Sequence, residues 1–109
     1  MREDRNERAG LLPDGTLAGT DAKAQARQIF ANIEALLAAH GARPEHLVKL
    51  LTFVAGTEHL AGYRAAQAEA FAHWFPAGDF PAQSLVVVAA LAGPDYAAEV
   101  EAIAAVPVA

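Results

Sequence analysis

The sequence predicts an α+β fold, in which a mixed β-sheet carries two helices packed on one of its faces. Two segments with helical periodicity alternate with apolar, strand-like runs along the chain. A strand, a helix and a second strand in succession predict a parallel crossover. A short turn then separates the last two strand-like runs, which favours an antiparallel hairpin.

The first predicted helix begins at Thr20 or Asp21, either of which can cap it, and ends near His40, before Gly41. Its apolar residues recur at helical spacing and form one face. They are Ala26, Ile29, Phe30, Ile33, Leu36 and Leu37. Gln25, Gln28 and Asn32 lie off the centre of this face, and Gln28 and Asn32 are expected on the exposed surface.

The residues before this helix divide into two parts. Met1 to Arg8 are nearly all charged or polar, which is typical of a disordered arm or a solvated loop. Pro13-Asp14-Gly15 is a turn signal. The sequence therefore predicts a charged N-terminal arm over residues 1–12 and a single domain over residues 13–109.

The middle of the chain predicts a strand and a second helix. Leu47–Val54 is apolar on both faces, and Lys49 is interpreted as a side chain that extends to solvent rather than as a catalytic lysine. The helix is expected from about Glu58 to Phe75, with Thr57 as its cap. Tyr63 and Gln67 belong to its inner stripe.

The C-terminal part predicts two further strands. Phe80–Leu91 contains the run Leu85–Leu91, whose lack of alternation is typical of a strand buried on both faces. A return strand from about Ala98 to Val106 is expected to pair with it. There Glu99 and Glu101 share one face, and the apolar residues share the other.

Two of the three predicted strands are apolar on both faces, yet two helices can cover only one face of the sheet. A homo-oligomer is the simplest cover for the other face. The chain has no cysteine and a net charge of −5, which argue against thiolate metal sites and against a nucleic-acid partner. The sequence contains neither an apolar run long enough to span a bilayer nor a signal peptide, so we expect a cytoplasmic protein without a membrane partner. The four histidines (His40, His46, His59 and His73) show no metal-ligand spacing, and no metal site is predicted.

Four strings carry a resemblance to a known family: Gln25–Ile33, Leu47–Lys49, Phe80–Ala82 and Glu99–Ala104. From about Pro13 to Val106 the chain resembles the Rid (YjgF-type, RidA-like) imine/enamine deaminases. The resemblance implies a chorismate-mutase-like fold, a homotrimer with ligand clefts between subunits, and hydrolysis of reactive 2-imino acids to 2-oxo acids and ammonia without a cofactor. The family's N-terminal β-hairpin has no counterpart before Leu11, so an N-terminally shortened fold is expected, with a reading frame that continues upstream of Met1.

The resemblance also implies the site. In the family, a carboxylate at the second glutamate of the Glu-x-Glu string shuttles protons, and this position is Glu101 here. The family's substrate-binding arginine directly follows the Pro-Ala pair, but Gln83 occupies that position. A neutral amide can still donate to a carboxylate, with a weaker hydrogen bond than a guanidinium makes. Ser84 is expected as a strand-edge hydroxyl rather than a nucleophile, and it is included among the substrate-binding residues.

Arg64 is the candidate replacement for the missing cation. In an ungapped alignment from Leu47–Lys49, it occupies a position where active relatives carry an asparagine on the second helix. Arg64 and Gln83 are thus interpreted as a coupled exchange of two ligand-binding groups, and the alternative is a solvated helix arginine.

Three functions follow from these observations. The first is a Rid-like hydrolytic deaminase with altered or reduced activity, similar to 2-iminobutanoate/2-iminopropanoate deaminases. The second is a non-catalytic trimeric binding protein for small carboxylate or carbonyl metabolites. The third, an RNA-cleaving activity attributed to some relatives, is disfavoured by the acidic chain.

Overall fold

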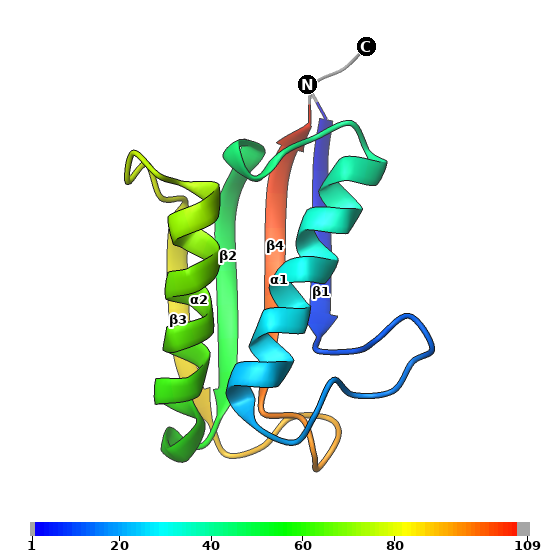
Figure 1. The fold of residues 1–109 in the computed structure, drawn as a ribbon, viewed down its shortest axis with the longest axis vertical. Helices are drawn as coiled ribbons and strands as arrows, with labels where there is room; N and C mark the ends of the chain where they lie inside the picture. Colours follow the sequence, from blue (N-terminus) through cyan, green and yellow to red (C-terminus); the bar gives the residue numbers. More distant parts are fainter. Residues whose placement is uncertain (1, 107–109) are drawn as a thin grey trace.

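A computed structural model of the chain describes residues 2–106, without the side chains of residues 2–8. It contains two helices and four strands: β1 (Arg2–Ala9), α1 (Ala22–Ala39), β2 (Leu47–Ala55), α2 (Leu60–Trp74), β3 (Ala82–Val88) and β4 (Ala98–Val106). Short 3-10 turns, η1 (Pro44–His46) and η2 (Thr57–His59), precede β2 and α2. Both helices lie on the same face of the sheet (Figure 1). The predicted α+β fold is confirmed.

The four strands form one mixed sheet in the order β1-β4-β2-β3. β2 and β3 are parallel, as the strand–helix–strand succession predicts, and β4 is antiparallel to both β1 and β2. The predicted hairpin between the last two strands is wrong, because β2 lies between them. The connection crosses the end of β2, where the Ala55 and Gly56 amides donate to the Ala97 and Val88 carbonyls, each at 2.9 Å.

The N-terminal segment differs from its prediction. The expected arm or solvated loop is wrong for Arg2–Ala9, whose backbone pairs with β4 from Val106 to Glu99 and forms an edge strand of the sheet. Met1 lies outside the described residues. Backbone pairing satisfies the N–H and C=O groups along the outer edge of β4 and needs no apolar alternation. The N-terminal part of the predicted 1–12 arm therefore belongs to the sheet.

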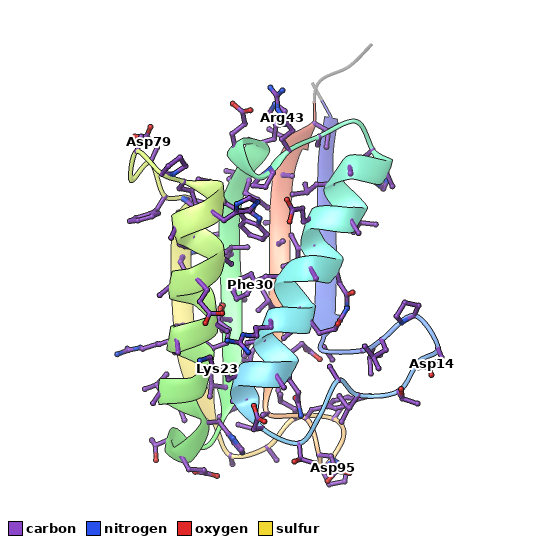
Figure 2. All side chains as sticks on the ribbon, in the orientation of Figure 1. Asp14, Lys23, Phe30, Arg43, Asp79 and Asp95 are labelled. Atoms are coloured by element: carbon purple, nitrogen blue, oxygen red, sulfur yellow. The ribbon has the colours of Figure 1, made fainter. Side chains whose placement is uncertain are left out.

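The core lies between the helices and the sheet. Asp21 caps α1 as expected, with its Oδ1 accepting from the Ala24 amide at 2.7 Å. Phe30 projects from α1 into the space between the two helices (Figure 2), where its ring contacts the rings of Tyr63 and Trp74 at centroid distances of 6.0 and 5.6 Å. The buried residues of β2 and β4 include Leu50, Val54, Val100, Ala102 and Ala104.

The start of α2 was predicted incorrectly. Thr57 does not cap it, because Thr57–His59 form a 3-10 turn and α2 begins only at Leu60. Gly56 has a φ of +89°, and this left-handed residue redirects the chain immediately after β2.

Burial along β4 and β3 tests the face assignments. β4 alternates as predicted, with Val100 buried and the glutamates at positions 99 and 101 on the other face. β3 is not buried on both faces in the single chain, because it is an edge strand, and Val86 and Val87 are 42% and 41% exposed.

Two polar residues of α1 hold the loops. The Gln25 side chain is fully buried, where it donates to the carbonyls of Gly19 and Asp95 and accepts from the Ala97 amide. Asn32, expected on the exposed surface, is half-buried and donates to the Leu11 carbonyl at 2.8 Å. No helix of the described part of the chain has the length and hydropathy needed to cross a membrane.

Candidate functional site

A groove of about 610 Å³ runs between α2 and the edge strand β3. It exists because β3 ends the sheet, so no further strand fills the space beside α2. α2 and β3 run in opposite directions (Figure 1), and the residues that face the groove are therefore met in reverse order on the two elements. They include Arg64, Gln67 and Phe71 on α2, and Phe80, Gln83 and Leu85 on β3 and the segment before it.

Gln83 lies on the helix-covered face of β3, in the middle of this groove. Its Oε1 accepts from Gln67 Nε2 at 2.9 Å, and its Nε2 donates to Gln67 Oε1 at 2.7 Å, so that the two amides form a reciprocal pair. The same Nε2 lies 3.2 Å from Thr52 Oγ1 and 3.5 Å from the Tyr63 hydroxyl. These partners satisfy the Gln83 amide within the protein.

Arg64 lines the same groove from α2 and is exposed. The structure thus brings together two of the four predicted site residues, Arg64 and Gln83. Arg64 supplies an exposed cation, whereas the neutral Gln83 amide is already paired with Gln67 and Thr52, so the groove can receive an anion at Arg64.

The other two predicted residues, Glu101 and Ser84, lie on the opposite, open face of the sheet. Both are in register with Leu51, which separates them. Ser84 Oγ accepts from Lys49 Nζ at 2.8 Å. Lys49 thus extends over the open face, and Glu101 of one chain does not lie on the same side of the sheet as Gln83.

Thr52 and Tyr63 form a polar pair beneath the groove that the site prediction missed. Both are fully buried, and their hydroxyls lie 3.0 Å apart. Burial raises the pKa of Tyr63 to about 12, against the lowering effect of its hydrogen bonds to Thr52 and Gln83. The sequence signal for this pair was a threonine inside an apolar strand, followed by a tyrosine and a glutamine four residues apart on the next helix.

Aromatic residues form one end of the groove. The Phe80 ring stacks on Phe71 at a centroid distance of 5.5 Å with an interplanar angle of 27°, and meets the edge of Phe75 at 6.1 Å. Phe80 nevertheless remains 61% exposed. A second, smaller cavity of about 270 Å³ lies between α1 and α2, near the Arg27–Glu69 ion pair, and is lined by none of the four predicted residues.

Metal ligands do not gather at either place. Within the described residues, no group of three or more His, Cys, Asp or Glu side chains is arranged to hold a metal ion.

The comparisons with known proteins agree with this architecture. Residues 7–106 match the family described as Endoribonuclease L-PSP. No curated protein matches significantly. Among solved structures, the chain resembles a protein of unknown function of the Rid family, YyfB from Yersinia pestis, with 32% identity and a TM-score of 0.82 over 95% of this chain and 78% of that one.

Two Escherichia coli proteins are also similar. The YjgF gene product shares 32% identity at a TM-score of 0.81, covering 94% of this chain and 79% of that one. TdcF, solved with bound serine, shares 25% identity at a TM-score of 0.82, covering 97% and 81%. With a family match over nearly its whole length and Rid proteins as structural relatives, the chain belongs to the Rid/YjgF family, described as Endoribonuclease L-PSP.

Proposed function

We propose that this protein is a Rid-type hydrolase, which converts reactive 2-imino or enamine acids to 2-oxo acids and ammonia and binds the substrate carboxylate through an altered anchor. The observation that carries the proposal is the shared groove of Arg64 and Gln83. The family's arginine corresponds to position 83 on β3, whereas here the cation is Arg64, which lines the same groove from α2. The cation that binds the substrate carboxylate therefore lies on the opposite side of the groove.

The reaction needs water and a group that transfers protons. Water adds to C2 of the imine, a proton passes from the added water to the nitrogen, and the resulting carbinolamine releases ammonia and leaves the 2-oxo acid. No external oxidant or reductant is required. Glu101 is the proposed proton-transfer group, because a carboxylate can accept a proton from the added water and pass it to the nitrogen.

Glu101 lies on the open face of the sheet, so the proposal includes assembly. A homotrimer, in which open faces pack together, would cover the apolar residues Val86 and Phe53 and allow a carboxylate of one copy to approach the groove of another. The face is suited to this because it combines exposed valine with half-buried leucine and phenylalanine.

An ammonia-release assay on freshly generated 2-iminopropanoate and 2-iminobutanoate tests the reaction. The wild-type protein is expected to accelerate release, and Glu101→Gln to reduce turnover at least about 100-fold while retaining calorimetric binding of 2-oxobutanoate. The matched control is Glu99→Gln, on the same face of β4, which should retain activity. Equal rates for the wild type and Glu101→Gln would refute the catalytic role.

The anchor is tested by binding. Arg64→Ala is expected to weaken 2-oxobutanoate binding by about 2 kcal/mol, or roughly 30-fold, as for the loss of a charge-assisted hydrogen bond. Gln83→Arg alone should not restore family-type turnover, because two cations would meet one carboxylate. Arg64→Asn combined with Gln83→Arg should restore it. Unchanged affinity in Arg64→Ala would show that Arg64 is a surface residue.

A second candidate is a trimeric binding protein that does not turn its ligand over. The reciprocal amide pair of Gln83 and Gln67 favours it, because both amides are already satisfied and a neutral groove floor activates a substrate less than a guanidinium does. The serine bound to the similar TdcF shows that a relative holds a small amino acid. Binding of 2-oxobutanoate without ammonia release would select this function.

RNA cleavage, the activity in the family's description, has weaker support here. A net charge of −5 opposes the phosphate contacts on which RNA affinity depends.

A further inference from the structure

The α2/β3 groove is chemically graded along its length. The antiparallel arrangement of α2 and β3 sets Arg64 near Leu85, Gln67 beside Gln83, and Phe71 against Phe80. The groove thus has a cationic end, an amide middle and an aromatic end. Phe71 follows Arg64 by seven positions on α2, which corresponds to about 10 Å along the helix axis.

The aromatic end is packed on one side and open on the other. Phe80 packs on Phe71 and on the edge of Phe75, yet most of its surface is exposed. A large aromatic side chain held in place and left exposed is typical of a surface that receives an apolar group. Beside it, α2 presents Ala68 and Ala72, whose small side chains leave the groove wide.

Charge defines the orientation of a ligand. Arg64 attracts a carboxylate to its own end, while Asp79 directly precedes Phe80 and lies on the loop between α2 and β3 at the far end (Figure 2). An anionic head is therefore favoured near Arg64 and disfavoured near Phe80. The apolar part of the ligand must then point toward Phe71 and Phe80.

We propose that the groove selects 2-imino acids, and their 2-oxo acid products, that carry an aromatic or long apolar side chain rather than a methyl or ethyl group. This inference rests on the proposed function and names its substrate class. The carboxylate binds Arg64, the C2 centre lies beside the amide pair, and the side chain packs on Phe80. A volume of about 610 Å³ is far larger than a three-carbon acid requires and falls in the range of sites for larger ligands.

Calorimetry with two 2-oxo acids tests the preference without depending on turnover. The intact chain is titrated with 3-phenyl-2-oxopropanoate and with 2-oxopropanoate, which differ only by the phenyl group. The phenyl acid is expected to bind at least about tenfold more tightly, because it buries an aromatic ring. Equal affinities would overturn the inference, whatever the outcome of any mutation.

Variants locate the phenyl subsite. Phe80→Ala should reduce the ratio of the two affinities about tenfold. Arg64→Ala should weaken the binding of both acids and leave the ratio of their affinities unchanged. Leu12→Ala removes an exposed apolar side chain outside the groove and is the matched control, with the ratio unchanged. Light scattering on Phe80→Ala verifies the assembly state. A ratio that persists in Phe80→Ala would overturn the placement of the side chain.

Ammonia release separates this inference from the proposed function. Turnover of 2-iminopropanoate with no preference for the phenyl acid would refute the inference alone. A clear preference for the phenyl acid in binding, with no ammonia released from either imine, would refute the hydrolase and leave the binding specificity intact.

Discussion

The two faces of the sheet carry different chemistry, although the same strands supply both. On the helix-covered face, Leu50, Val54 and Val100 are completely buried, and the polar groups there are paired with one another. On the open face, Leu51 and Phe53 are half-buried, Val86 is 42% exposed, and Lys49 reaches across to Ser84. The covered face therefore has the composition of a finished core, whereas the open face is apolar but only partly covered in the single chain, as the proposed trimer requires.

Strand β3 offers a matched pair for testing this difference. Val86 and Val87 are almost equally exposed, at 42% and 41%. Val86 is in register with Phe53 on the open face, and Val87 with Val54 on the helix-covered face. Any effect that differs between them reports on the face and not on the loss of valine.

The largest expected effect is on assembly. Val86→Asp should dissociate the proposed trimer, because it places a charge in an apolar interface at a cost of several kcal/mol. Val87→Asp should retain the trimer, since its side chain lies at the sheet edge beside α2. Light scattering coupled to gel filtration measures both. A wild-type protein that is a stable monomer at micromolar concentration would refute the trimer, and equal dissociation by both variants would refute the face assignment.

The next largest effect concerns stability. Leu50→Ala should lower the free energy of unfolding by about 2–5 kcal/mol, because Leu50 is fully buried in the core. Its neighbour Leu51 points to the open face, so Leu51→Ala should weaken assembly more than it destabilises the single chain. Denaturant unfolding in a Val86→Asp background separates the two contributions. If Leu50→Ala and Leu51→Ala lowered the free energy of unfolding equally in that background, the proposed difference between the two faces would be contradicted.

An intermediate effect depends on pH. The pKa of Tyr63 is raised to about 12 by burial, above its ordinary value near 10. Below pH 10 the tyrosine is neutral in both states, and its stabilising contribution is complete. As pH rises from 10 toward 12, the unfolded chain ionises first, so stability is lost, by about 1.4 kcal/mol at pH 11.

Tyr63→Phe tests this pH dependence. The variant should be less stable near pH 8, because it removes the hydroxyl that pairs with Thr52, but it should lose less stability between pH 9 and 11. Tyr96→Phe, in the loop before β4, is the matched control. Parallel pH profiles for the wild type and Tyr63→Phe would show that folding does not raise the pKa of Tyr63.

Much of the fold was predictable because local signals and burial agree. Asp21 caps α1 where the periodicity begins, and β4 alternates as its glutamates indicate. Pairing was harder. The order of β2 between β3 and β4 depends on long-range contacts, and a short apparent turn favoured a hairpin that does not form. The charged N-terminal strand was missed because edge pairing uses the backbone, which leaves no pattern in the side chains.

The site was predictable only in part. The ungapped alignment singled out Arg64, and in the structure Arg64 lines the same groove as Gln83. This agreement arises because helical spacing on α2 determines which residues face β3. The partners of Gln83 were not foreseen. Gln67, Thr52 and Tyr63 come from two other elements, and the spacing within any one of them does not reveal their convergence. The functional roles of Arg64 and Gln83, like those of Glu101 and Ser84, stay predictions.

The smallest expected effect compares one hydroxyl from each face. Ser84 Oγ accepts from Lys49 on the open face, where Ser84 is exposed, so Ser84→Ala should change the free energy of unfolding by less than about 1 kcal/mol. Thr52 is fully buried beneath the groove, in contact with both Tyr63 and Gln83. Thr52→Val keeps the volume but leaves these partners with one hydrogen bond fewer, at a cost of about 1–3 kcal/mol.

Denaturant unfolding compares the two variants, and calorimetry with 2-oxobutanoate adds a second measurement. A Ser84 hydroxyl that binds substrate should lose about 1 kcal/mol of ligand affinity in Ser84→Ala despite the small change in stability. Unchanged affinity would confine Ser84 to its contact with Lys49, and a stability loss equal to that of Thr52→Val would mean that the open face is already covered in solution.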